Sequence, residues 1–117
     1  MRKQTKSSMT RKLDKRMSDI VRSLGYCQRC GPHVPQRYEI LQCAHIYSRT
    51  YRSVRWERQN LLCLCAGCHF YFHRNPLEFG EWVQNYLGAK YVILKAQATA
   101  IKKWTVPEMV EYYEALG

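Results

Sequence analysis

The stretch "LCLCAGCHFYFHRNP", residues 62–76, holds three of the six cysteines and two of the four histidines of the chain. Cys65 and Cys68 form a Cys-x-x-Cys unit here, and Cys27 and Cys30 form another upstream. Because each unit can present two thiolates to one tetrahedral ion, the two units together predict a structural four-cysteine Zn²⁺ site. The 34 residues between the units predict a structured insertion rather than a short zinc ribbon. Four buried or redox-active thiols are the alternative interpretation.

Two histidines follow the second cysteine unit. His69 and His73 are four residues apart, so a helix places both imidazoles on one face, where they can share a divalent cation. Packing in a helical core is the alternative for such an isolated pair. Cys43 and Cys63 lie outside the two Cys-x-x-Cys units, and we expect them to be small buried hydrophobic side chains.

The positive charge lies in the first half of the chain. Residues 1–58 hold 14 of the 19 Lys and Arg but only four of the nine Asp and Glu, so they carry the whole net charge of +10. Such a concentration is typical of a surface that binds a polyanion such as DNA. A solubilising surface is the plain alternative, and a membrane surface is a weaker third one.

The chain shows no secretory or membrane-spanning pattern. Its N-terminus lacks an apolar signal segment, and no apolar run approaches about 18 residues. We therefore expect a cytoplasmic protein with no membrane partner, in a reducing compartment where paired Cys-x-x-Cys units are more often metal sites than disulfides. The length predicts a single domain, residues 1–117.

Hydrophobic periodicity predicts an α+β fold. A basic amphipathic helix is expected within residues 1–25, followed by a loop rich in Gly and Pro. Short strands are expected over 38–46 and 60–65, joined by a basic connector. The second strand leads directly into a helix over 66–74.

Residues 77–117 are expected to be helical. Asn75 and Pro76 resemble a capped helix start, and Thr105 followed by Glu108 resembles another. The residues expected on the buried stripes of all these helices are Met9, Leu13, Met17, Ile20, Val21, Leu24, Phe79, Trp82, Val83, Tyr86, Leu87, Tyr91, Leu94, Ala98, Ile101, Met109, Val110, Tyr113 and Leu116.

Three segments resemble the HNH, or ββα-metal, endonucleases: "CQRC" at 27–30, "CAHIYSR" at 43–49 and "RWERQNLLCLCAGCHFYFHRNP" at 55–76. The zinc-stapled phage type looks closest, and the NinG/Rap-like recombination nucleases share an N-terminal basic helix and an "HxxSR"-like segment. The resemblance implies a small ββα-metal core with a four-cysteine zinc knuckle pair over residues 26–76. The basic helix of residues 1–25 and the helices of residues 77–117 would flank that core.

The resemblance also implies roles for single residues. His45 is implied to deprotonate a water, and Asn60 to brace the loop that orients His45. His69 and His73 are implied to bind the catalytic divalent ion. The implied reaction is metal-dependent hydrolysis of DNA phosphodiester bonds. A neutral imidazole can take a proton from water at neutral pH, and the metal offsets charge on the phosphate and on the leaving 3′ oxygen.

Position 44 departs from the family pattern. Many members have Asp or His directly before the general base as a further metal ligand, whereas this chain has Ala44. Two imidazoles suit a softer ion such as Ni²⁺ or Zn²⁺ better than Mg²⁺ or Mn²⁺, with water and phosphate oxygens in the remaining positions. Three alternatives stay open: metal binding by His69 alone, a contribution from Cys43 or Glu39, and an inactive DNA-binding relative.

Basic residues near the proposed site are the expected DNA contacts. Arg49, four residues after His45, is a candidate phosphate clamp because a guanidinium binds two oxygens at once. A generic role in a basic loop is the alternative for Arg49. The other expected nucleic-acid-binding residues are Lys12, Arg16, Arg52, Arg55 and Arg58. The aromatic residues interleaved with them as packing or stacking groups are Tyr47, Tyr51 and Trp56.

We therefore expect a DNA endonuclease that serves phage or prophage DNA recombination or processing in the cytoplasm of a bacterial host. Branched or nicked DNA is a candidate substrate, and resolution of DNA junctions would imply a homodimer. Two other classes stay open. One is a non-catalytic zinc-stabilised nucleic-acid-binding module, and the other is a zinc-stabilised adaptor that binds an acidic protein.

Overall fold

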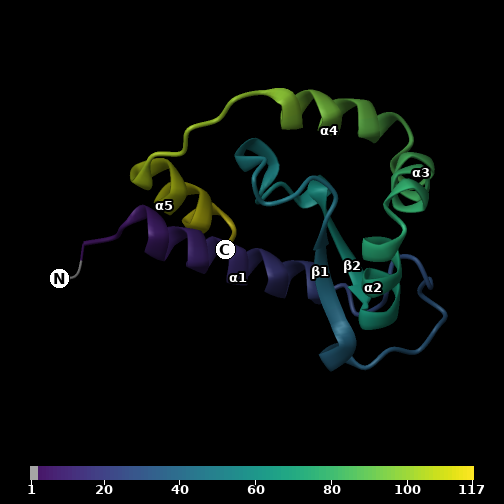
Figure 1. The fold of residues 1–117 in the computed structure, drawn as a ribbon. Coiled ribbons are helices and arrows are strands. Elements are labelled where there is room, and N and C mark those ends of the chain that lie inside the picture. The colour runs from purple at the N-terminus through teal and green to yellow at the C-terminus, as the bar shows by residue number, and fades with distance from the viewer. Residues whose placement is uncertain (1–2) are drawn as a thin grey trace.

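The computed structural model describes residues 3–117 as a mixed α and β fold, which confirms the expected α+β class (Figure 1). The regular elements are α1 (Lys6–Arg22), β1 (Leu41–His45), β2 (Leu61–Cys65), α2 (Ala66–Arg74), α3 (Pro76–Leu87), α4 (Ala89–Thr99) and α5 (Val106–Ala115). Short 3-10 helices lie in the connections: η1 (Tyr38–Ile40), η2 (Arg52–Val54) and η3 (Arg58–Asn60). The two strands and α2 together place the candidate site.

Helix α1 forms because its sequence supplies both a cap and one apolar stripe. The Thr5 hydroxyl accepts a hydrogen bond from the Ser8 N–H at 3.0 Å, and the Ser8 hydroxyl accepts one from the Thr5 N–H at 3.0 Å. This reciprocal capping satisfies two N–H groups that the helix start leaves free. The buried side chains recur every four residues: Met9, Leu13, Met17 and Val21. Through that stripe α1 packs against both strands and against α5, which lies alongside it in Figure 1.

Strands β1 and β2 form an antiparallel pair in which His45, at the end of β1, lies opposite Leu61. All five residues of β2 are buried, as expected for an apolar strand that is covered on both faces. Side chains alternate along β1. Gln42 and Ala44 lie on the face toward α2, whereas Cys43 and His45 line a cavity together with residues of α1. The two faces of β1 therefore contribute to different parts of the site.

The C-terminal helices cover the connection between the strands and then return to α1. Leu94 and Ala98 of α4 pack on the buried Val54 of η2, so α4 arches over the β1–β2 connection in Figure 1. Helix α5 packs on α1 and contributes Met109 to the main core. This arrangement covers η2 and η3 of the connection that follows His45 with α4.

The strand expected over 38–46 is wrong in its first third. Residues Tyr38–Ile40 form η1, and β1 covers only Leu41–His45. The reason lies in the partner strand, because β2 ends at Cys65 and Cys65 also caps α2. Residues before Leu41 consequently have no strand residues of β2 to pair with.

Three residues expected on buried stripes, Leu24, Tyr86 and Ile101, are exposed. Leu24 lies beyond Arg22, where α1 ends, and Ile101 lies beyond Thr99, where α4 ends. Neither side chain is therefore on a helical stripe. The other residues expected on these stripes are buried or half-buried.

Within residues 3–117, no helix combines the length and the apolar composition that a membrane crossing requires.

Candidate functional site

Four thiols gather where the loop after α1 meets the start of α2. The sulfur atoms of Cys27, Cys30, Cys65 and Cys68 all lie within 4.8 Å of one another. The Sγ of Cys30 is 3.6 Å from that of Cys68 and 4.0 Å from that of Cys65. Tetrahedral Zn²⁺ with Zn–S bonds of about 2.3 Å separates its sulfur ligands by roughly 3.8 Å, so the spacing fits. The predicted cluster is confirmed, and its four cysteines are positioned to bind a metal ion, consistent with structural zinc.

N–H groups face these sulfurs. The Cys30 N–H donates to Cys27 Sγ and the Cys68 N–H donates to Cys65 Sγ, each at 3.4 Å. The Arg29 Nη1 donates to Cys68 Sγ at 3.7 Å. Burial alone would raise the pKa of Cys27, but neighbouring N–H groups, led by that of Cys30, outweigh burial and lower this pKa. Burial raises the pKa of Cys68 and raises that of Cys30 to about 12. Cys27 is therefore the thiol at which the site favours the thiolate, the form that binds a metal.

His69 and His73 lie next to this cluster, one helical turn apart on α2. Their ring centroids are 4.9 Å apart, as the spacing predicts. His69 Nδ1 lies 2.6 Å from Gln42 Oε1 on β1. Burial, and then the neighbouring His73, lower the pKa of His69, so its imidazole is neutral at neutral pH and can bind a divalent ion. Sequence reasoning did not single out Gln42, because no local pattern marks a contact between residues 27 positions apart.

His45 lies between two cavities. One, of about 150 Å³, is lined by Ala44, Phe72 and His73 in addition to His45. The other, of about 320 Å³, is lined by residues of α1 and of the basic connector. The sequence predicts that the imidazoles of His45, His69 and His73 converge, and the structure brings two of the three together. His45 shares the smaller cavity with His73, but the four thiols form the one metal-ligating cluster of three or more side chains within residues 3–117.

The surroundings of His45 hold its imidazole neutral. The side chain is half-buried, and this burial, followed by the positive charge of Arg49, lowers the pKa of His45. The carboxylate of Asp14 and the backbone of Arg55 act in the opposite direction but are outweighed. A neutral imidazole at this position can accept a proton at neutral pH.

Asn60 is fully buried and joins the two ends of the segment that follows His45. Its Oδ1 accepts from the Tyr47 N–H at 2.7 Å. Its Nδ2 donates to the carbonyls of Tyr47 and Val54, each at 3.0 Å. The side chain is thereby satisfied in the core and holds the loop in place. This geometry suits the brace that the sequence predicts, whose catalytic effect stays a prediction.

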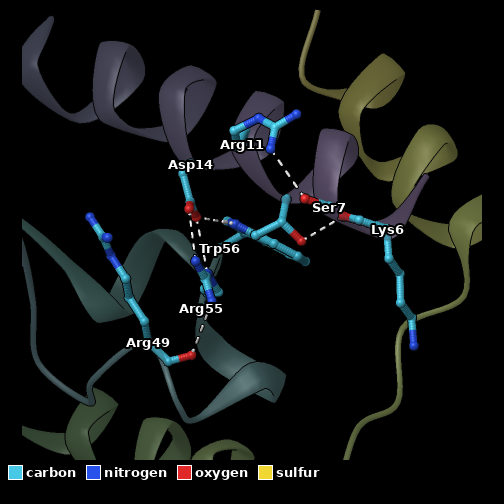
Figure 2. Close-up of polar contacts among 8 residues, drawn as sticks. Lys6, Ser7, Arg11, Asp14, Arg49, Arg55 and Trp56 are labelled. Carbon is cyan, nitrogen blue, oxygen red and sulfur yellow. Dashed lines mark hydrogen bonds and ion pairs between the residues drawn. The ribbon is translucent and has the colours of Figure 1, made fainter. Parts of the chain in front are cut away.

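Asp14 links α1 to the basic connector, and Figure 2 shows its carboxylate joined to both Arg55 and Trp56. Arg55 donates from Nε to Oδ1 at 3.0 Å and from Nη2 to Oδ2 at 2.8 Å. Trp56 donates from Nε1 to Oδ1 at 2.9 Å. Burial would raise the pKa of Asp14, but the hydrogen bonds from Arg55 and Trp56 lower it below the usual value. Sequence reasoning missed this role of Asp14. The one feature of the sequence that could have pointed to it is an acidic residue on a strongly basic helix.

The basic residues that the sequence predicts as DNA contacts fall into two groups. Those held by partners within the chain are Arg55 on Asp14, Arg58 on the Leu61 carbonyl at 2.8 Å, and Arg16 on the Gly117 carbonyl at 2.9 Å. These contacts give each of the three guanidinium groups a partner within the chain, and their contact with DNA stays a prediction. Those with exposed side chains are Lys12, Arg49 and Arg52, and they stay predicted contacts. Trp56 is 2% exposed, so it packs in the core rather than stacking on DNA.

Fold and site together define a small α+β protein in which a four-thiol metal site adjoins a strand, a braced loop and a helix that carries two histidines. Residues 27–77 match the family model described as HNH endonuclease. The matched segment is less than half of the chain. No curated protein and no solved structure matches the chain. The match shows that this segment is similar to HNH endonucleases.

Proposed function

We propose that the protein is a metal-dependent DNA endonuclease that hydrolyses phosphodiester bonds with a water activated by His45. One observation carries the proposal. The neutral imidazole of His45 is followed by a loop that Asn60 braces, and it shares a cavity with His73 of the paired imidazoles. These residues lie inside the segment that matches the HNH endonuclease model.

Each residue has a physical task in this reaction. An imidazole nitrogen of His45 takes a proton from the attacking water. Arg49 is exposed beside His45 and binds the phosphate oxygens. His69 and His73 would hold a divalent ion, whose chemistry is to offset the negative charge on the phosphate and on the leaving 3′ oxygen. Asn60 keeps the loop after His45 from moving, so the imidazole needs no rearrangement to react.

The residues present fit a divalent ion with imidazole preference. His69 and His73 lie side by side on α2, but Ala44 offers no ligand from β1. Water and phosphate oxygens would therefore supply the remaining ligands of such an ion. Two imidazoles favour Ni²⁺ or Zn²⁺ over Mg²⁺ or Mn²⁺, which prefer oxygen ligands.

We further place this activity in phage or prophage DNA recombination or processing, in the cytoplasm of a bacterial host. The support is the resemblance of the sequence to the zinc-stapled phage type, together with the paired Cys-x-x-Cys units, which in a reducing compartment are more often metal sites than disulfides. Branched or nicked DNA is the proposed substrate. A homodimer follows if the substrate is a junction, because symmetric cleavage needs two sites.

Cleavage assays with supercoiled plasmid and with a four-way junction, in each of the four divalent ions, test the proposal. We expect nicking by the zinc-loaded protein and a loss of about 10²- to 10⁴-fold in His45→Ala, with DNA affinity retained. His33→Ala is the matched control, because His33 is exposed in the loop after Cys30, and it should cleave like the wild type.

Other outcomes favour other classes. DNA binding without cleavage under every ion would indicate a non-catalytic zinc-stabilised nucleic-acid-binding module. Failure to bind DNA even at low salt would indicate an adaptor for an acidic protein. Native mass spectrometry of the same junction samples reports the oligomeric state, and a strict monomer would contradict junction resolution.

A further inference from the structure

Gln42 of β1 reaches across to α2 and contacts His69. Its Oε1 lies 2.6 Å from His69 Nδ1, a short hydrogen bond that joins the strand to the helix. We propose that Gln42 is a positioning residue that fixes the tautomer and the ring orientation of His69 for metal binding. The inference deepens the function proposed above, because it concerns the same divalent-ion site.

The chemistry follows from the identity of the acceptor. The amide oxygen of Gln42 has only lone pairs to offer, so the proton of the neutral His69 imidazole lies on Nδ1. The lone pair then lies on Nε2, which is the nitrogen left free to bind a metal. In protein metal sites such a hydrogen bond to the second ring nitrogen fixes the orientation of the imidazole and raises its basicity.

The strand explains why position 42 can do this. Gln42 lies opposite Leu64 in the β1–β2 ladder, so its backbone is held on a rigid element. It lies on the same strand face as Ala44, where the family pattern places a further metal ligand. Ala44 has no ligating atom. Among residues 3–117, the side-chain hydrogen bond that links His69 to β1 is the one with Gln42. The contribution of β1 to the divalent-ion site is therefore an orienting contact through Gln42.

The first test measures metal affinity without DNA. Zinc-loaded protein is titrated with Ni²⁺ in a calorimeter, and Gln42→Met removes the amide acceptor while keeping the length of the side chain. We expect Gln42→Met to weaken Ni²⁺ binding by about 10- to 100-fold, and Gln42→Glu, which keeps an acceptor, to retain it. Gln84→Ala is the matched control, because Gln84 is exposed on α3, and it should bind like the wild type.

The second test reads the tautomer directly. Long-range ¹H–¹⁵N spectra of the zinc-loaded protein without Ni²⁺ should show His69 protonated on Nδ1 in the wild type and in Gln42→Glu. Gln42→Met should lose this preference. A merely structural role of Gln42 would leave both the tautomer and the Ni²⁺ affinity unchanged.

The outcomes separate this inference from the proposed function. Equal Ni²⁺ affinity in wild type and Gln42→Met, or His69 protonated on Nε2 in the wild type, would overturn the inference about Gln42. Neither result would contradict the proposed nuclease function. Ni²⁺ binding that depends on Gln42, in a protein that cleaves no DNA, would overturn the proposed nuclease function and support the inference about Gln42. A wild type that binds no Ni²⁺ beyond its zinc would overturn the inference whatever the cleavage result.

Discussion

At the scale of single residues, the ionisation of His45 decides the pH range of the proposed reaction. Burial and then Arg49 lower the pKa of His45 below its usual 6.5. A general base works only when unprotonated, so activity is present above this lowered pKa and is lost as the pH falls through it. We expect the acid limb of kcat/KM to have its midpoint below 6.5. Initial cleavage rates between about pH 5 and 8 measure it.

Replacing Arg49 separates its charge from its other roles. In Arg49→Ala the midpoint of the acid limb should rise toward 6.5, because the charge that lowers the pKa of His45 is gone. Arg49→Lys keeps a positive charge and should keep the midpoint. The cleavage rate on the plateau above the acid limb reports phosphate binding by Arg49 and is compared separately from the midpoint. The other groups that act on His45 are the same in both variants: Asp14 and the Arg55 backbone, which raise its pKa, and the Arg55 charge, which lowers it. An acid limb above 6.5 in the wild type would contradict the assignment of His45 as the base.

At the scale of elements, one ion pair ties α1 to the connector that carries the proposed DNA contacts. The side chains of Arg55 and Asp14 are only 13% and 24% exposed, so solvent screens the pair less than it screens a surface pair. A double-mutant cycle with Asp14→Asn and Arg55→Met, read by urea unfolding of the zinc-loaded protein, should give a coupling of about 1–2 kcal/mol. Because the pKa of Asp14 is lowered below 3.8, this stability is present above that pH and is lost as the pH falls through the lowered pKa.

The same helix provides the control for that cycle. Lys15 and Asp19 form an exposed pair at 2.8 Å, with side chains 78% and 41% exposed. Their cycle should show no measurable coupling, because water and salt screen both charges. Equal coupling in the two cycles would mean that the Asp14 contact adds nothing specific to the attachment of α1.

Local signals in the sequence predict the elements well where a cap or a period marks them. The capping box of Thr105 and Glu108 begins α5 as expected, and Pro76 opens α3. The start of β1 and the partners of Arg16 and Arg55 are tertiary features, so sequence patterns did not reveal them. The sequence does not distinguish a basic side chain that is solvated from one that contacts DNA or a buried carboxylate.

At the scale of the whole molecule, the two metal sites differ in how far the sequence predicts them. The zinc site depends on two local Cys-x-x-Cys turns, and its four sulfurs meet as predicted. The divalent-ion site depends on which face of β1 each residue takes. His45 and Gln42 are three positions apart, so a strand places their side chains on opposite faces. The sequence predicts a single cleft for His45, His69 and His73. One cavity of about 150 Å³ brings His45 and His73 together, and His69 contacts Gln42.

The zinc site joins the loop after α1 to the corner between β2 and α2. The loop that carries Cys27 and Cys30 meets β2 through Gln28, whose N–H donates to the Cys63 carbonyl at 2.8 Å and whose Oε1 accepts from the Cys63 N–H at 2.7 Å. Structural zinc contributes about 10–16 kcal/mol of apparent binding free energy in peptide systems. The net stability of a domain is about 5–15 kcal/mol. The metal is therefore expected to hold the whole core together and not only the loop.

Zinc removal should consequently unfold the core cooperatively. We expect about one tightly held zinc per chain by elemental analysis, and loss of helical circular dichroism when a strong chelator removes it. Cys65→Ser should lose zinc and stability together. Cys43→Ser is the matched control, because Cys43 lies on the neighbouring strand with its pKa raised to about 11 by burial and has no part in the cluster; it should retain the metal. A chain without zinc that keeps its fold, or equal zinc loss in both variants, would show that the four thiols do not hold this molecule together.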